Sequence, residues 1–297
     1  MDIRPLKQFL SLADSLHFGR ASELCHVSPS TLSRAIKQLE QELGVELFIR
    51  DNRSVTLTAE GERFQRYARD AVSQWEQLRA SLMEQSGVLQ GEISLYCSVT
   101  ASYSFLYDIL SRFRRDFPRI EIKLHTGDPE PALSRIQAGT EDLAIAAHPD
   151  SLPSGLAFKT IALSPLLFIA PRHTLPGEQP VRELVTAGHW EQVPMIVSEE
   201  GLSRKRVNAW FSQRGVKPRI YAQVAGNEAI VSMVSLGFGV GVVPQIVLEN
   251  SPLANNVETL KVSPALAPYQ VGLVAQQKNL RNPLVKALWQ QLPDNQR

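Results

Sequence analysis

The chain has 297 residues, of which 43% are hydrophobic and 21% charged, and its formal net charge is +1. This composition excludes a disordered chain, and the length allows two or three domains. The opening stretch MDIRPLKQFLSLADS carries charges and no long apolar run. We therefore expect neither an export signal nor a membrane span, and we expect a cytoplasmic protein. Cys25 and Cys97 have no metal-binding or redox spacing, so we expect both to be reduced.

Three helices are predicted in the first 44 residues. Apolar residues recur at helical spacing from Ile3 to Ala13 and again in FGRASELCHV. After a break of about three residues follows SPSTLSRAIKQLEQELG, where Ser28 can cap a helix, Pro29 suits its first turn and Gly44 can end it. A tight turn between the second and third helices is the geometry of a helix-turn-helix unit.

The predicted third helix has an apolar stripe and a polar face. We expect Leu32, Ile36, Leu39 and Leu43 to form one buried stripe. The remaining face then contacts either solvent alone or a ligand. Its candidate DNA-contacting residues are Ser28, Ser30, Thr31, Ser33, Arg34 and Lys37.

Net charge does not distinguish these two interpretations, because residues 1–57 hold seven basic and seven acidic side chains, a balance of zero. The position of the charges is more informative. Arg34 and Lys37 lie in the first half of the third helix, and Glu40 and Glu42 lie in its second half. One helix end can therefore approach phosphates, and we expect the other to stay in water.

The segment GVELFIRDNRSVTLT predicts two short strands, 47–50 and 54–57, joined by a turn at Asp51 and Asn52. Three helices followed by a hairpin form a winged helix-turn-helix, which places one helix in the major groove and the hairpin against the DNA backbone. Arg50 and Arg53, at the edges of the hairpin, are further candidate DNA contacts.

A single long helix is predicted over residues 58–85, because Thr58 can cap it and no proline interrupts it. Its apolar residues follow a near-heptad spacing, which indicates pairing with a second copy. The alternative is packing against the downstream part of the same chain. The seam comprises Phe64, Ala68, Ala71, Trp75, Leu78 and Leu82, and residues 86–91 are predicted to form a hinge.

From residue 91 onward, short apolar runs alternate with helical stretches. Such continuous runs are typical of strands buried on both faces, and the alternation predicts an α/β fold with two small sheets that share a cleft. The runs are ISLYCSV, IEIKLHTG, DLAIAAHP, LLFIAP, PMIVSE, RIYAQVAG, GVGVVPQ and YQVGLVAQ.

Polar residues follow several of these predicted strands, where helix N-termini offer free amides to an anion. Each is also typical of an ordinary cap or turn. Taken together with a basic side chain they predict a pocket for a small carboxylate. The candidate effector-binding residues are Ser98, Thr100, Ser102, Asp128, Ser198, Ser203, Arg204 and Asn227.

Enzymatic interpretations find little support in the sequence. GFGVGV follows a helical run, so it resembles a helix stop more than a nucleotide-binding loop, and the histidines have no metal-ligand spacing. Cys97 is either a nucleophile or, as we expect without a neighbouring base, a buried strand residue. We predict no catalytic residue, metal or cofactor.

The residues 1–60 resemble the LysR-type transcriptional regulators, and the segments SVTAS, DLAIA and GFGVGVVP extend the resemblance along the chain. The resemblance implies a winged helix-turn-helix (1–58), a dimerisation helix and hinge (59–90) and a two-lobed, periplasmic-binding-protein-like effector domain (91–297). We expect lobe I at about 91–161 and 268–297 and lobe II at about 162–267. The implied partners are double-stranded promoter DNA, further copies in a homodimer or homotetramer, and RNA polymerase.

Within this family, HFGRASELCHVSPSTLSRAIKQLE and GNEAIVSMVSLGFGV look like the activators of isoleucine and valine biosynthesis. That implies acetolactate or acetohydroxybutyrate as effector; the alternatives are a LysR-type regulator of another pathway, or a two-lobed solute-binding protein. Many members carry Gln-Pro where this chain has Pro29 and Ser30. Ser30, Thr31 and Arg34 are then the expected readers of DNA, and Arg34 can contact either a base or a phosphate.

Overall fold

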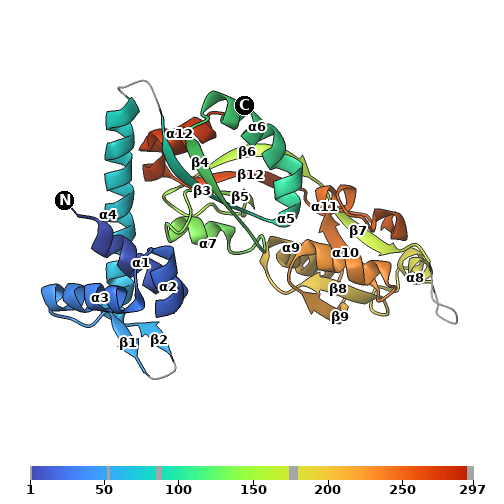
Figure 1. Ribbon diagram of the computed structural model, residues 1–297. Helices are drawn as coiled ribbons and strands as arrows, with labels where there is room; N and C mark the ends of the chain where they lie inside the picture. Colours follow the sequence, from blue (N-terminus) through green and yellow to red (C-terminus); the bar gives the residue numbers. More distant parts are fainter. Residues whose placement is uncertain (1, 52–53, 85–88, 174–179, 293–297) are drawn as a thin grey trace.

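The computed structural model describes residues 2–51, 54–84, 89–173 and 180–292. The N-terminal helices and hairpin lie at one end of a long helix, α4, and two α/β lobes follow it (Figure 1). Within these ranges, no helix combines the length and the apolar character that crossing a membrane requires.

The N-terminal domain has the predicted helices and hairpin: α1 (Arg4–Ser15), α2 (Phe18–Leu24), α3 (Pro29–Leu43), β1 (Phe48–Arg50) and β2 (Val55–Leu57). Its local signals act as expected. The Ser28 hydroxyl accepts a hydrogen bond from the amide of Thr31 at 3.1 Å, and Gly44 ends α3 with a left-handed φ of 70°. Phe9, Leu12, Leu32 and Ile36 are completely buried and form the centre of this domain's core.

Two details of α3 differ from the prediction. Leu43 is exposed, so the buried stripe ends at Leu39. Glu40 does not stay in water. Its carboxylate accepts hydrogen bonds from the amides of Leu47 and Phe48 and pairs with Arg50 at 2.6 Å, which fixes the hairpin to the helix. The charge count could not predict these contacts, because the partners follow Glu40 across a turn.

The long helix α4 spans Ala59–Glu84, and the Thr58 hydroxyl accepts from the amide of Gly61 at 2.9 Å, as a helix cap does. Its first turns belong to the N-terminal domain. Phe64 packs edge-on against Phe9, with 4.8 Å between the ring centres, and Ala68 is completely buried in the same core. Further along, α4 contacts the first lobe through α12 (Pro283–Trp289).

Each lobe contains a five-stranded sheet, ordered β4-β3-β5-β12-β6 in the first lobe and β11-β7-β10-β8-β9 in the second. The chain enters the second sheet after β6 and returns to the first with β12. The strands are β3 (Gly91–Cys97), β4 (Ile120–Thr126), β5 (Leu143–Ala147), β6 (Leu156–Ser164), β7 (Leu166–Pro171), β8 (Pro194–Ser198), β9 (Arg219–Val224), β10 (Val240–Pro244), β11 (Val257–Leu260) and β12 (Tyr269–Gln276).

Helices cover both sheets, so both lobes are α/β layers as predicted (Figure 1). The first lobe carries α5 (Val99–Ala101), a π-helical turn at Ser102–Leu106, α6 (Tyr107–Asp116), α7 (Ala132–Gln137) and α12. The second carries α8 (Val181–Ala187), α9 (Gly201–Ser212), α10 (Asn227–Ser235) and α11 (Gln245–Glu249), with a short 3₁₀ turn at Ala254–Asn256. Another 3₁₀ turn, at Gln277–Arg281, follows β12 in the first lobe.

The strand prediction was incomplete. It omitted β6, whose apolar run is interrupted by Lys159 and Thr160, and β11, which has only four residues. It was also wrong to expect every run to be buried on both faces, because β4 and β9 are edge strands with mostly exposed side chains. Edge strands pair on one side only, and hydrophobicity alone does not identify them.

Gly61 is a position where α4 and the hairpin leave no room for a side chain. A Cβ at this position would collide with the backbone oxygen of Leu47 and lie 3.0 Å from Leu57. Gly61→Ala should therefore destabilise the N-terminal domain by about 1–3 kcal/mol, as overpacking does. Amide hydrogen exchange in α1 to α3 should quicken accordingly. The exposed neighbour Arg63→Ala is the control, and equal exchange in both variants would contradict the close packing.

Candidate functional site

The N-terminal half of α3 presents hydroxyls and positive charges to solvent. Ser28 bonds through its hydroxyl to those of Ser30 and Thr31, at 2.9 and 2.8 Å, and all three residues are exposed. Ser33 is half-buried. The capping network therefore holds the hydroxyls at the first turn, where free amides also point outward.

The basic residues predicted around this face differ in their surroundings. Arg34 and Lys37 are exposed, and neither has a hydrogen bond or ion pair to any described residue. Arg50 is engaged inside the domain, because it pairs with Glu40 and lies 5.6 Å above the Phe18 ring. Arg53 falls outside the described residues. Arg34 and Lys37 are thus the basic side chains of α3 that remain available to phosphates or bases.

The apolar seam of α4 divides into two parts. Phe64 and Ala68 are used within the N-terminal core, whereas Ala71 and Trp75 are half-buried. Leu78 and Leu82 are 52% and 62% exposed in the single chain. The other side of α4 faces the first lobe, where Asp70 pairs with Lys278 at 2.6 Å. The structure therefore shows packing of α4 against the downstream lobe, and the described residues leave Leu78 and Leu82 at the distal end of the seam more than half exposed.

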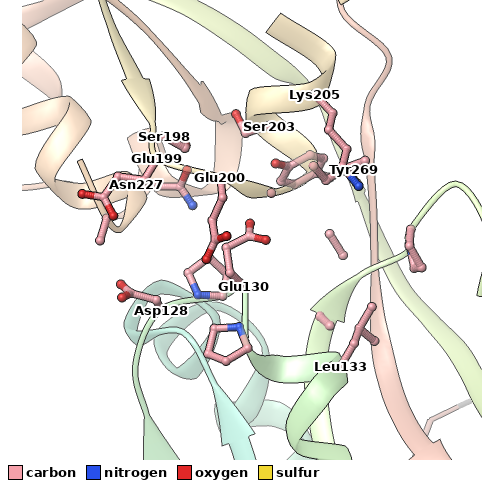
Figure 2. Close-up of a pocket in the computed structure, with 18 of the residues that line it drawn as sticks. Asp128, Glu130, Leu133, Ser198, Glu199, Glu200, Ser203, Lys205, Asn227 and Tyr269 are labelled. Carbon is pink, nitrogen blue, oxygen red and sulfur yellow. The ribbon is translucent and has the colours of Figure 1, made fainter. Parts of the chain in front are cut away.

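A cavity of about 810 Å³ lies between the two lobes. The first lobe contributes the loop before α7 and the residues after β5, and the second contributes the ends of β8 and β9 with the starts of α9 and α10 (Figure 2). The cavity therefore occupies the position predicted for a ligand in such a fold, beyond strand ends and beside helix N-termini.

The predicted effector-binding residues separate into two groups. Asp128, Ser198, Ser203 and Asn227 line the cavity, whereas Ser98, Thr100, Ser102 and Arg204 are absent from its described lining.

The second group is engaged elsewhere in the chain. Ser98 caps α5 by accepting from the Ala101 amide, the Thr100 hydroxyl donates to Glu228, and the Ser102 hydroxyl donates to a backbone oxygen. Arg204 donates to the Ser198 carbonyl and to Gln223, at 2.9 and 2.8 Å. Its guanidinium therefore supports the end of β8 from outside the cavity.

The cavity residues that sequence reasoning missed include Glu130, Glu200, Lys205 and Tyr269. The acids and the lysine stand in the segments HTGDPE and SEEGLSRKR, but an exposed charge next to a strand end is too common to single them out. Tyr269 begins β12 and comes from a distant part of the sequence. Tyr269 reaches the cavity only through the pairing of β12 in the first sheet, which the local sequence does not predict.

The cavity is rich in negative charge. Its lining holds Asp128, Glu130, Asp150, Glu199 and Glu200 against the single lysine Lys205. Partial burial, followed by the charge of Glu200, raises the pKa of Glu130 above its ordinary value, and Lys205 opposes this shift. A carboxylate that binds here must find its compensating charge at Lys205 or at helix amides.

The loop that carries Asp128 is held from behind. The Tyr96 hydroxyl donates to the Asp128 carbonyl at 2.7 Å, and the Arg135 guanidinium lies 4.8 Å above the Tyr96 ring. Arg135 also pairs at 2.7 Å with Glu141, whose side chain is fully buried. This buried network fixes the floor of the cavity.

Catalytic interpretations fail on burial and geometry. Cys97 is completely buried, and this desolvation raises the pKa of its thiol to about 11, so the nucleophilic thiolate is scarce near neutral pH. Both cysteines are free thiols. The GFGVGV segment ends α10 and leads into β10, as predicted. Across the described part of the chain, no cluster of three or more His, Cys, Asp or Glu is arranged to hold a metal ion.

Family models match almost the whole sequence. The model for "LysR substrate binding domain" matches residues 86–297, and that for "Bacterial regulatory helix-turn-helix protein, lysR family" matches residues 3–62. The HTH-type transcriptional activator IlvY of Salmonella typhimurium is 47% identical over 99% of this chain and 100% of its own length. The HTH-type transcriptional regulator IlvY of Escherichia coli K12 is 46% identical, with the same coverage.

Solved structures share the fold. Full-length OxyR from Pseudomonas aeruginosa, in a variant form, superposes with a TM-score of 0.69 at 23% identity, covering 100% of this chain and 98% of that one. CbnR complexed with its target DNA gives a TM-score of 0.62 at 19% identity, covering 98% of each chain. At these identities the likeness shows the arrangement of domains and lobes.

Proposed function

The chain belongs to the LysR family of bacterial transcriptional regulators, and from this premise we propose that it activates a branched-chain amino-acid biosynthetic gene in response to a small carboxylate. Relatives at 46–47% identity are named as IlvY activators or regulators and not as enzymes. We divide the chain into a DNA-binding domain (1–58), a dimerisation helix with its hinge (59–90) and an effector domain (91–297).

DNA recognition is assigned to α3 because its first half combines fixed hydroxyls with unpaired basic side chains. A helix-turn-helix of this kind inserts its third helix into the major groove and leaves phosphate contacts to flanking residues. We assign base contacts to Ser30, Thr31 and Arg34, and a contact with the DNA backbone to Lys37. The exposed and unpaired state of Arg34 and Lys37 is the observation that carries this proposal.

Pairing of α4 with a second copy follows from the uncovered end of its seam. Two leucines that are more than half exposed on a long helix gain free energy by contact with an identical helix. A dimer then presents two copies of α3 to two half-sites. Dimers can pair further into a tetramer. The exposed leucines of α4 do not distinguish a dimer from a tetramer.

The effector is assigned to the cavity between the lobes. Acetolactate and acetohydroxybutyrate are small hydroxylated keto acids. Their carboxylate can pair with Lys205 and accept hydrogen bonds from the amides at the start of α10. Ser203 and Asn227 supply neutral polar partners. The alternative within the family is a different small anion in the same cavity.

Removal of the Arg34 guanidinium tests whether α3 contacts DNA bases. Arg34→Ala should weaken binding to the specific duplex by about 1–3 kcal/mol if it contacts a base, and Lys37→Ala should weaken all duplexes alike and lower the salt slope by about one. Fluorescence anisotropy at several salt concentrations measures both. Lys286→Ala on α12 is the control, and unchanged affinity in both α3 variants would refute this assignment.

A charge at the exposed end of the seam tests the dimer. Leu78→Asp leaves the protomer intact because Leu78 faces solvent there, but it would bury a carboxylate between two paired helices at a cost of several kcal/mol. Sedimentation should show dissociation. Leu163→Asp makes the same change at an exposed leucine of β6. Equal mass for both variants and the wild type would place the interface elsewhere.

Thermal unfolding with a panel of small oxo- and hydroxy-acids tests the effector. A ligand at a hundredfold excess over its dissociation constant stabilises by about 2.7 kcal/mol, and freshly prepared acetolactate should give the largest shift. Asn227→Ala should reduce the shift, whereas Thr100→Val should keep most of it because Thr100 does not line the cavity. The reverse pattern would move the ligand to the junction after β3. A larger shift with another acid would assign a different pathway.

A further inference from the structure

The cavity brings carboxylates of the two lobes into proximity. Glu130 belongs to the loop before α7, and its carboxylate rests on Gly201, the first residue of α9 in the other lobe. A side chain at Gly201 would overlap the Glu130 carboxylate, so the approach is close. Figure 2 shows Glu130 and Glu200 extending toward each other from opposite sides of the cavity. The two acids thus form a pair across the cleft.

The charge of the lining makes this pair sensitive to a ligand. Five acidic side chains and one lysine give the described lining a formal charge of 1 − 5 = −4 when all are ionised. A bound carboxylate adds one more negative charge and displaces water that screens the others. Like charges in such a space favour the neutral form of a carboxyl, and one proton on the pair removes the repulsion.

On the basis of the carboxylate effector proposed above, we propose that the Glu130–Glu200 pair takes up a proton when the effector binds, so that effector affinity rises as the pH falls. The protonated carboxyl then becomes an additional hydrogen-bond donor in the cavity. The proton comes from solvent, and the carboxyl O–H bond is the one bond formed.

Charged and titratable groups face Glu130 from each element around it. Helix α9 provides Lys205, and Glu200 immediately precedes that helix; the loop of Glu130 itself provides Asp128, and β12 provides Tyr269. Burial raises the pKa of Tyr269 to about 12, so it stays neutral in the physiological range. Burial and the two acids raise the pKa of Glu130, whereas Lys205 lowers it. In the ligand-free protein, Glu130 is thus already displaced toward its protonated form.

The sign of the pH effect follows from the direction of these shifts. Binding raises the pKa of Glu130 further, so the bound state holds more protons than the free state between the free and bound pKa values. In that window a lower pH favours the complex, by up to about tenfold in affinity per pH unit for one linked proton. The carboxyl of a 2-hydroxy acid titrates well below this window and does not contribute.

Calorimetry with freshly prepared acetolactate, on the full-length protein at pH 6, 7 and 8, measures this linkage. Titrations at each pH in two buffers of different ionisation enthalpy give the number of protons taken up. The wild type should take up as much as about one proton per ligand and bind more tightly at pH 6 than at pH 8. Glu130→Gln, which is neutral at every pH, should lose most of the uptake and bind more tightly than the wild type at pH 8.

Two further variants separate this proposal from simpler explanations. Glu200→Gln should also reduce the uptake, whereas Glu183→Gln, which removes a charge on α8 away from the cavity, should keep it. Binding without proton uptake, uptake that persists in both Glu130→Gln and Glu200→Gln, or binding that depends on added Mg²⁺ instead would overturn the proposal while the effector assignment stands. Absence of binding at every pH would overturn both.

Discussion

The first turns of helix α4 pack into the N-terminal core, and the position of the two lobes relative to the N-terminal domain depends on this packing. Phe64 and Ala68 are part of the same buried cluster as Phe9, so the helix cannot turn independently of α1 and α3. The next residue, Arg69, pairs with Asp14 of α1 and donates to the Ala138 carbonyl of the first lobe at 3.0 Å. Its side chain is only 14% exposed, and its charge-assisted contacts join α4 to both α1 and the first lobe.

The loop at the floor of the cavity is connected to the Arg69 contact by one short helix, α7. Asp128 lies in the loop before α7, held by the Tyr96 hydroxyl, and Ala138 follows α7 directly. The Gln276 side chain donates to the Gln137 carbonyl at 3.1 Å and ties the end of α7 to β12. A ligand that binds two lobe arrangements unequally can therefore move α7 and the Arg69 contact together. Regulation requires this unequal binding, because a ligand with equal affinity for both arrangements changes nothing.

Local signals were sufficient to predict the N-terminal domain and the class of the rest. Ser28 and Gly44 mark the ends of α3, and the uninterrupted run after Thr58 predicts α4, because caps and breakers act over a few residues. The cavity lining depends instead on segments far apart in sequence. Arg204 and Lys205 are neighbours in sequence, yet the 100° rotation per residue of a helix turns one toward β8 and the other into the cavity. The sequence alone offers no way to choose between them.

The acidic lining also limits which anions suit the cavity. A monocarboxylate can place its one charge near Lys205 and offer its hydroxyl as a donor to the surrounding carboxylates. A di- or tricarboxylate would bring each further charge among Asp128, Glu130 and Glu200, where no second base lines the described cavity. Each unpaired charge in a partly desolvated space costs several kcal/mol in principle, which is larger than the difference that separates most related ligands. For the carboxylate effector proposed above, excess negative charge in the cleft therefore favours a small hydroxylated monoacid over the more highly charged acids of central metabolism.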